Sequence, residues 1–328
     1  MARIIPARGA VEEAAERLSR GELVAIPTET VYGLAADATN GEAVARIFEA
    51  KNRPRFNPLI AHVADRAMAE RIARFDALSS LLADRFWPGP LTLVLPLKAG
   101  SRISSLVTAG LDTIAVRMPV GVARDIAARL DRPLAAPSAN PSGKLSATTA
   151  AAVEAGLGDR ISLIVDGGAA RIGVESTIVR VADGQLTLLR PGGVPAEDIE
   201  AATGKPVRRS ETGAAVEAPG MLASHYAPAA RLRLEIASVR PGEALLAFGP
   251  HRANGVEKAM ATRNLSAGGD LREAAANLFA HLHELDASGA ATIAVEPVPG
   301  DGLGAAINDR LARAAAPREP VVAGNGAS

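Results

Sequence analysis

The sequence predicts an α/β fold in two parts: a twisted mixed sheet with packed helices, then a smaller, Rossmann-like parallel α/β domain. Over the first two-thirds of the 328 residues, strand-like and helix-like segments alternate. The pair Asp183-Gly184 separates two strand-like runs and is typical of an antiparallel hairpin, which argues against a purely parallel sheet. From residue 231 a second pattern of strand, helix, strand and helix favours a small parallel sheet.

The elements of the first part follow from apolar spacing. The first 21 residues predict a short strand and an amphipathic helix. Asn40 can cap a second helix, which should end before Pro54. Further strands are predicted at residues 22–27, 58–63, 91–96, 113–119, 162–168 and 176–189. Further helices are predicted at residues 66–75, 78–86, 121–131, 147–156 and 195–203.

The second part is shorter and is separated by a run without periodicity. Its strands are predicted at residues 244–249 and 292–297, and its helices at residues 270–285 and 303–315. The run before it is rich in Ala, Gly and Pro, as linkers are. We therefore expect domains at residues 1–208 and 231–316, a linker or lid at 209–230, and a disordered tail at 317–328.

Charge and composition exclude several classes of protein. The 36 basic and 36 acidic residues balance, so no overall positive field draws the chain to nucleic acid or an anionic membrane. The lack of cysteine excludes disulfides, thiolate catalysis and cysteine-based zinc sites, and it fits a cytoplasmic location. We find no signal-peptide core and no apolar run long enough to span a bilayer.

The strongest polar cluster, KNRPRFNP, lies where a predicted helix ends and a predicted strand begins. Three cationic side chains are expected just beyond the sheet edge, where open α/β sheets bind ligands: Lys51, Arg53 and Arg55. Lys and Arg suit phosphate oxygens, and each charge-assisted bond is worth about 1.5–3 kcal/mol. Cations at a helix C-terminus can also merely complement the helix dipole. Asn57 and the two prolines form a rigid polar turn, which favours the phosphate site.

A second polar loop, APSANPSG, presents Ser138 and Asn140 between two prolines. Hydroxyl and amide groups on a fixed loop suit a phosphate or a ribose, although a short S-A-N turn is also common in plain loops. The next residues, Ser142-Gly143-Lys144, resemble the end of a P-loop. The upstream glycine is missing, so we reject a P-loop.

Several single residues are weaker candidates. Arg117 ends a predicted strand and can clamp a carboxylate, and Arg190 ends another; a lone Arg there is often only a surface group. His62 lies beside the cations, where a buried structural histidine is the alternative. His281 and His283 face apart on a predicted helix, and no metal site made of protein side chains is expected.

The motifs PTETVYGLAADA, KNRPRFNPL, APSANPSG and GVESTI occur in this order and resemble the YrdC-type family. The runs APGMLASHYAP, NLSAGGDLREAAANLF and GLGAAINDRLARAA resemble its long, two-domain form. The resemblance covers nearly the whole chain. It implies a YrdC-like sheet in the first domain and an L-threonylcarbamoyladenylate synthase activity, which is a nucleotidyl transfer.

The resemblance implies that L-threonine, bicarbonate and ATP give threonylcarbamoyl-AMP and pyrophosphate. That product is used for the threonylcarbamoyladenosine modification next to the tRNA anticodon, by a tRNA threonylcarbamoyl-transferase machinery. The resemblance neither implies nor excludes a direct contact between this protein and tRNA. The implied catalytic residues are Lys51, Arg53, Ser138 and Asn140. The implied ATP site consists of Arg53, Asn57, Thr113, Ser138, Ser146, Arg190 and Tyr226. The implied threonine site consists of Thr30, His62, Arg117, the backbone of Ala136, and Ser176.

The residue types agree with this division of the site. Arg117 can bind the threonine carboxylate, while Lys51, Arg53 and Arg190 can neutralise phosphates, so we expect positioning and no covalent enzyme intermediate. Mg²⁺ is expected to arrive with ATP, held mainly by phosphate and water. The linker that carries Tyr226 can exclude water as a lid, and deletion of residues 219–228 should then greatly reduce product yield.

Two alternatives stay open. One is an enzyme that uses another amine as the acceptor. The other is an RNA-binding or ribosome-maturation module that uses the basic groups around Lys51, although zero net charge and few aromatic residues count against it. Pyrophosphate release with single amino acids separates these functions.

Overall fold

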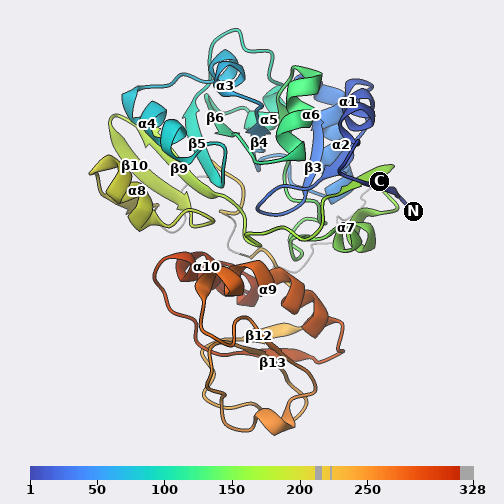
Figure 1. The fold of residues 1–328 in the computed structure, drawn as a ribbon, viewed down its shortest axis with the longest axis vertical. Coiled ribbons are helices and arrows are strands. Elements are labelled where there is room, and N and C mark those ends of the chain that lie inside the picture. Colours follow the sequence, from blue (N-terminus) through green and yellow to red (C-terminus); the bar gives the residue numbers. More distant parts are fainter. Residues whose placement is uncertain (211–215, 222–223, 318–328) are drawn as a thin grey trace, which may run out of the picture.

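A large α/β domain and a small one make up the molecule (Figure 1). The structure is a computed structural model that describes residues 1–210, 216–221 and 224–317. The expected disordered tail lies outside the described residues except for its first position, as does part of the expected linker. By length and hydropathy, no helix in the described part of the chain could cross a bilayer.

The large domain contains one mixed sheet of eleven strands in the order β1-β8-β2-β3-β7-β4-β6-β5-β9-β10-β11. The strands are β1 (Arg3–Pro6), β2 (Val24–Ile26), β3 (Gly33–Asp37), β4 (Ile60–His62), β5 (Leu91–Pro96), β6 (Thr113–Arg117), β7 (Leu134–Ala135), β8 (Leu163–Asp166), β9 (Thr177–Ala182), β10 (Gln185–Arg190) and β11 (Val207–Arg209). Strand β6 pairs parallel with β4 and antiparallel with β5. The predicted mixed sheet is confirmed.

Helices cover both faces of this sheet. They are α1 (Val11–Ser19), α2 (Gly41–Lys51), α3 (Arg66–Ile72), α4 (Ala77–Phe86), α5 (Ser105–Thr108), α6 (Val122–Leu130), α7 (Ala150–Leu157) and α8 (Ala196–Thr203). Helices α1, α3, α4, α6 and α8 pack in one core, and α2, α5 and α7 in the other. In β2, Val24 and Ile26 join the first core and Ala25 joins the second, because successive strand side chains point to opposite faces.

Local sequence signals set the ends of key elements. Asp183 and Gly184 have φ of 51° and 68°, the left-handed pair of a tight hairpin turn between β9 and β10. The Asn40 side chain accepts two backbone N–H bonds and caps α2, which ends at Lys51, before Pro54. The predicted hairpin and cap are confirmed, and the predicted helices are present within a few residues of their expected ends.

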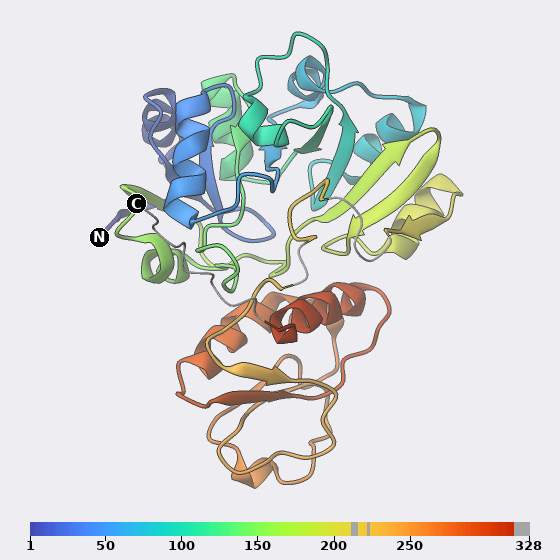
Figure 2. The same ribbon diagram turned by 180° about the vertical axis from the view of Figure 1, so that it is seen from behind.

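The small domain has a four-stranded parallel sheet in the order β12-β15-β13-β14, which confirms the predicted fold class. Its strands are β12 (Arg231–Arg233), β13 (Ala244–Ala247), β14 (Thr262–Asn264) and β15 (Thr292–Val295), with a short 3₁₀ helix η1 (Val256–Lys258). Helices α9 (Leu271–Asp286) and α10 (Leu303–Ala315) lie between this sheet and the large domain in both views (Figures 1 and 2).

The two domains share an apolar core. Val31, Leu145 and Val174 of the large domain belong to the same buried cluster as the apolar side chains of α9 and α10. Gly173 permits this contact, because its φ is 78° and a Cβ there would lie 2.2 Å from the carbonyl oxygen of Ala275 in α9. The close approach of the domains therefore requires glycine at this position.

Candidate active site

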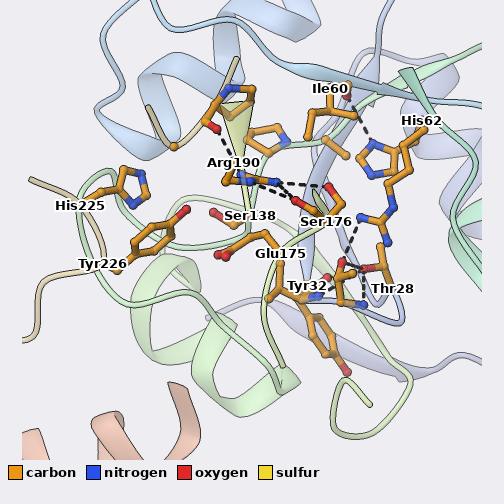
Figure 3. Close-up of a pocket in the computed structure, with 18 of the residues that line it drawn as sticks. Thr28, Tyr32, Ile60, His62, Ser138, Glu175, Ser176, Arg190, His225 and Tyr226 are labelled. Carbon is orange, nitrogen blue, oxygen red and sulfur yellow. Dashed lines mark hydrogen bonds between the residues drawn. The ribbon is translucent and has the colours of Figure 1, made fainter. Parts of the chain in front are cut away.

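A pocket lies in the large domain and is bounded on one side by linker residues, among them Pro219 and Tyr226. Figure 3 shows Thr28 and His62 toward one end, His225 and Tyr226 toward the other, and Arg190 between them.

The turn between β2 and β3 supplies one wall of the pocket. The Thr28 hydroxyl donates to the carbonyl oxygen of Val31 at 2.6 Å and lies 2.8 Å from the hydroxyl oxygen of Thr30. Hydroxyls that bond to nearby backbone are favoured in turns. The Thr30 hydroxyl also accepts from Arg117 Nη1 at 2.9 Å. The two threonines therefore shape the turn and present a fixed hydroxyl.

Two neighbouring strands bring His62 and Arg117 to the pocket from paired final positions of β4 and β6. Arg117 Nη2 lies 2.7 Å from Glu29 Oε1, and each side chain is only 4% exposed. A buried cation needs such a partner. The N–H donors of Arg117 are therefore held in fixed directions, and Glu29 balances the charge of the guanidinium.

Lys51 supports the loop that carries Ser138. The ammonium donates to the carbonyl oxygen of Ser138 at 2.6 Å and to that of Asn140. Burial, and secondarily the nearby Arg53, hold the pKa of Lys51 well below its usual value. The side chain does not line the pocket, so Lys51 acts on it through the loop.

Arg53 and Asn57 form the next part of the site. Arg53 lines the pocket and donates to the carbonyl oxygens of Asn57 and Pro58 at 3.3 and 3.0 Å. Burial lowers the pKa of Arg53 to about 10. The Asn57 amide is buried, and neither of its polar atoms has a hydrogen-bond partner among the described residues. Buried amides normally have partners, so this amide keeps unused hydrogen-bonding capacity next to the pocket, although it does not line it.

Arg190 ends β10 and is anchored by Ser176. Its Nε and Nη2 donate to the Ser176 carbonyl oxygen at 3.1 and 2.9 Å, and its Nη1 donates to the carbonyl oxygen of Pro219 in the linker at 3.3 Å. Burial lowers the pKa of Arg190. The guanidinium thus joins the sheet, Ser176 and the linker at the pocket wall.

The linker contributes His225 and Tyr226, whose rings meet edge-on with centroids 4.0 Å apart. Tyr226 is fully buried and has a φ of 61°, a region that non-glycine residues rarely occupy. Such a conformation persists where surrounding contacts hold it. Tyr226 is therefore held by its neighbours in the position seen in Figure 3.

Glu175 is a buried acid in the same pocket. It accepts hydrogen bonds from the Ser146 hydroxyl and, at 2.7 Å, from Arg310 Nε of the small domain. Burial by itself would raise the pKa of Glu175, but Arg310 and Arg190 bring it below its usual value. Glu175 therefore remains ionised inside the pocket.

The two histidines of the pocket are neutral at physiological pH. Burial lowers the pKa of His62 and that of His225 to about 3 each, and Arg117 adds to the effect at His62. They can exchange hydrogen bonds with a ligand but bring no positive charge. Within the described ranges, no group of three or more His, Cys, Asp or Glu residues could hold a metal ion.

Most of the site residues expected from the sequence meet in this one pocket. Those that line it are Thr30, Arg53, His62, Arg117, Ala136, Ser138, Ser176, Arg190 and Tyr226. Those that do not are Lys51, Asn57, Thr113, Asn140 and Ser146. Thr113 begins β6, about 13 Å along the strand from Arg117 at about 3.3 Å per residue.

Sequence reasoning gave no role to Glu29, Glu175 or His225. All three line or adjoin the pocket, and all three are buried. The signal was available, since each lies inside a motif beside a candidate residue and is charged or polar within a largely apolar run.

Comparisons with known proteins agree over both domains. A family model described as "Telomere recombination" (Sua5, YciO and YrdC proteins) matches residues 16–192, and one described as "Threonylcarbamoyl-AMP synthase, C-terminal domain" matches residues 194–316. The threonylcarbamoyl-AMP synthase of Pyrococcus abyssi is 42% identical, with 95% of this chain and 97% of the relative covered. That of Bacillus subtilis is 41% identical, with 94% and 93% covered.

Solved structures give the same result. The crystal structure of P. abyssi Sua5 complexed with L-threonine matches with a TM-score of 0.87 and 38% identity, covering 96% of this chain and 98% of that one. E. coli YciO, at 18% identity and a TM-score of 0.51 over 58% of this chain, shares the fold alone.

Proposed function

The chain belongs to the YrdC-type family of threonylcarbamoyl-AMP synthases, in its long two-domain form, and from that premise we propose the reaction it catalyses. It is an enzyme of the transferase class. We propose that it converts L-threonine, bicarbonate and ATP to threonylcarbamoyl-AMP and pyrophosphate in the cytoplasm. This is the first step of threonylcarbamoyladenosine modification next to the tRNA anticodon, and the product passes to a tRNA threonylcarbamoyl-transferase machinery.

The observation that carries this proposal is a single pocket with two chemically different parts. Around Thr30 and His62 it offers hydroxyl and imidazole groups and the donors of Arg117. Around Arg53 and Arg190 it offers two guanidiniums. The first part suits a small hydroxy amino acid and the second suits a triphosphate, so both substrates can be held side by side.

Threonine binding is assigned to the first part. The remaining donors of Arg117 orient the carboxylate, with Glu29 balancing the charge. Thr30, His62 and Ser176 receive the threonine hydroxyl. The Ala136 N–H already donates to the Ile60 carbonyl oxygen at 3.2 Å, so the Ala136 carbonyl is the backbone group offered to the amine.

ATP binding is assigned to Arg53, Asn57, Ser138, Arg190 and Tyr226. The threonine amine attacks CO₂ and releases a proton, or attacks bicarbonate with loss of water, and in either case forms a carbamate. A carbamate oxygen then attacks the α-phosphorus, the bond to the β-phosphate breaks, and pyrophosphate leaves. The guanidiniums neutralise the charge that develops on the phosphates, and the enzyme forms no covalent intermediate.

Mg²⁺ is proposed to enter with ATP. Glu175 is the carboxylate lining the pocket, and both of its oxygens are already bonded to protein groups. The ion is therefore held by phosphate and water, where it supplies charge neutralisation. His225 and Tyr226 cover the pocket and exclude water, which protects a carbamate from hydrolysis.

Lys51 and Arg53 bear on the alternative of an RNA-binding module. They are only 1% and 8% exposed, which leaves Arg55 as the exposed member of the cluster, so the three cations do not form a continuous accessible surface for RNA phosphates. The remaining alternative, a synthase that uses another amine, keeps the same pocket and differs in the group that Thr30, His62 and Ser176 recognise.

The test is pyrophosphate release by the purified full-length chain with ATP, bicarbonate and one amino acid at a time. Threonine should support release and yield threonylcarbamoyl-AMP by mass spectrometry, while alanine, which lacks the hydroxyl, should not. Equal rates with another amine would reject threonine as the substrate. RNA binding with a steep salt dependence and no pyrophosphate would favour the module.

A further inference from the structure

We propose that the small domain takes part in ATP binding through Arg310, a positioning residue that holds Glu175 and Tyr226 in place at the phosphate end of the pocket. The inference rests on the proposed function for the identity of the nucleotide. It gives a function to the small domain. None of the described residues of this domain lines the pocket.

Arg310 lies on α10 and is completely buried. Its Nε donates to Glu175 Oε2 at 2.7 Å, and its Nη1 donates to Asp309 Oδ2 at 2.6 Å. The guanidinium carbon lies 5.0 Å from the centroid of the Tyr226 ring, which is cation–π range. One small-domain side chain therefore contacts two residues of the pocket wall, one from the large domain and one from the linker.

The charge of Glu175 makes this contact matter for a phosphate ligand. A carboxylate that lines a triphosphate site repels the ligand unless a cation balances it. Arg310 is the cation directly bonded to Glu175, and burial in a low-dielectric environment makes that balance strong. Removing Arg310 would leave an unpaired anion facing the phosphates.

Arg310 also connects to Ser146 and Tyr226, two residues of the ATP site that the family resemblance implies. The second oxygen of Glu175 accepts from the Ser146 hydroxyl, so the carboxylate links Arg310 to Ser146. Tyr226 packs against Arg310 and, with ring centroids 5.7 Å apart, against Phe279 of α9. The left-handed backbone of Tyr226 is thus supported from the small domain.

Among the described residues, the side chains of Thr30, His62 and Arg117 at the threonine end make no hydrogen bond to the small domain. Thr30, His62 and Arg117 are bonded to residues of the large domain. A positioning role for Arg310 therefore predicts a selective effect on ATP. If Arg310 only holds the two domains together, its replacement should raise the KM for ATP and the KM for threonine equally.

The experiment measures steady-state pyrophosphate release and the KM for each substrate in full-length Arg310→Met and in Arg310→Met combined with Glu175→Gln. Arg310→Met should raise the ATP KM about tenfold, or about 1.4 kcal/mol, and leave the threonine KM within about twofold. The double variant should recover to within about threefold of the wild-type ATP KM, because glutamine keeps the Ser146 bond without the charge. Arg272→Met, at an exposed arginine of the same domain, is the matched control.

Parallel rises in both KM values, or a double variant no better than Arg310→Met, would overturn the inference. Should Arg310→Met fail to fold, Glu175→Gln alone decides: its ATP KM should stay level or fall, and a rise of about tenfold would show that Glu175 itself serves the nucleotide. Wild type that releases no pyrophosphate with threonine rejects the proposed function instead. In that case ATP titration calorimetry on the same variants still tests the Arg310 effect.

Discussion

Replacing Lys51 with methionine separates two roles for this residue. The sequence suggested a cation that contacts phosphate, whereas the structure directs the ammonium to the carbonyl oxygens of Ser138 and Asn140. Methionine keeps the apolar stem and removes both hydrogen bonds. Two bonds to a charged donor are worth about 3–6 kcal/mol, and relief of the buried ammonium's desolvation offsets several kcal/mol, so we expect a net loss of about 2 kcal/mol in unfolding free energy.

The loop that Lys51 holds carries Ser138 for ATP and Ala136 for threonine. Its displacement should therefore lower kcat/KM for both substrates, by up to about 100-fold if the loop moves by about 1 Å. Urea unfolding and pyrophosphate kinetics on wild type and Lys51→Met measure the two effects. An increase in ATP KM alone, with unfolding free energy and threonine KM unchanged, would refute the loop-support role and favour direct phosphate contact.

Three further predictions concern other parts of the structure. Arg117→Ala should raise the threonine KM about 30-fold, from the loss of about 2 kcal/mol, with little change for ATP; equal effects on both substrates would contradict the carboxylate role, and exposed Arg129→Ala is the control. Burial lowers the pKa of His225 to about 3, so below pH about 6.5 the imidazole binds a proton in the unfolded state but not in the folded state. The free energy of unfolding therefore decreases as the pH falls from about 6.5 toward 3. At pH 5 the loss from this group is about 2 kcal/mol, which His225→Gln should avoid in urea titrations. Gly173→Ala should destabilise the protein by about 3 kcal/mol, through its positive φ and the clash with Ala275, and a change below about 0.5 kcal/mol in the same titration would reject that packing argument.

The elements that the sequence predicted are those with strong local signals. Helix α2 has an Asn40 cap and regular apolar spacing, and the β9–β10 hairpin has its Asp-Gly turn. Five of the described strands were not predicted. Strands β3 and β7 consist largely of small residues without the branched side chains that signal a strand, and β11, β12 and β14 are three-residue strands rich in polar side chains. Their strand conformation comes from pairing with neighbours in the sheets.

The candidate site divides in the same way. Arg53, Arg117 and Arg190 could be selected from sequence because each ends or follows a predicted element and carries a charge suited to an anion. The pairing of Glu175 with Arg310 could not, because the two residues are 135 positions apart and belong to different domains. The same holds for the direction of the Lys51 ammonium, which depends on where a distant loop lies.

The central claim is that one pocket holds the amino acid and the nucleotide together. A crystal structure of the full chain with L-threonine and a non-hydrolysable ATP analogue tests it most directly. We predict the threonine carboxylate at Arg117, the triphosphate at Arg53 and Arg190, and the threonine amine facing the α-phosphate. Ligands bound in separate cavities, or neither bound in this pocket, would contradict the claim.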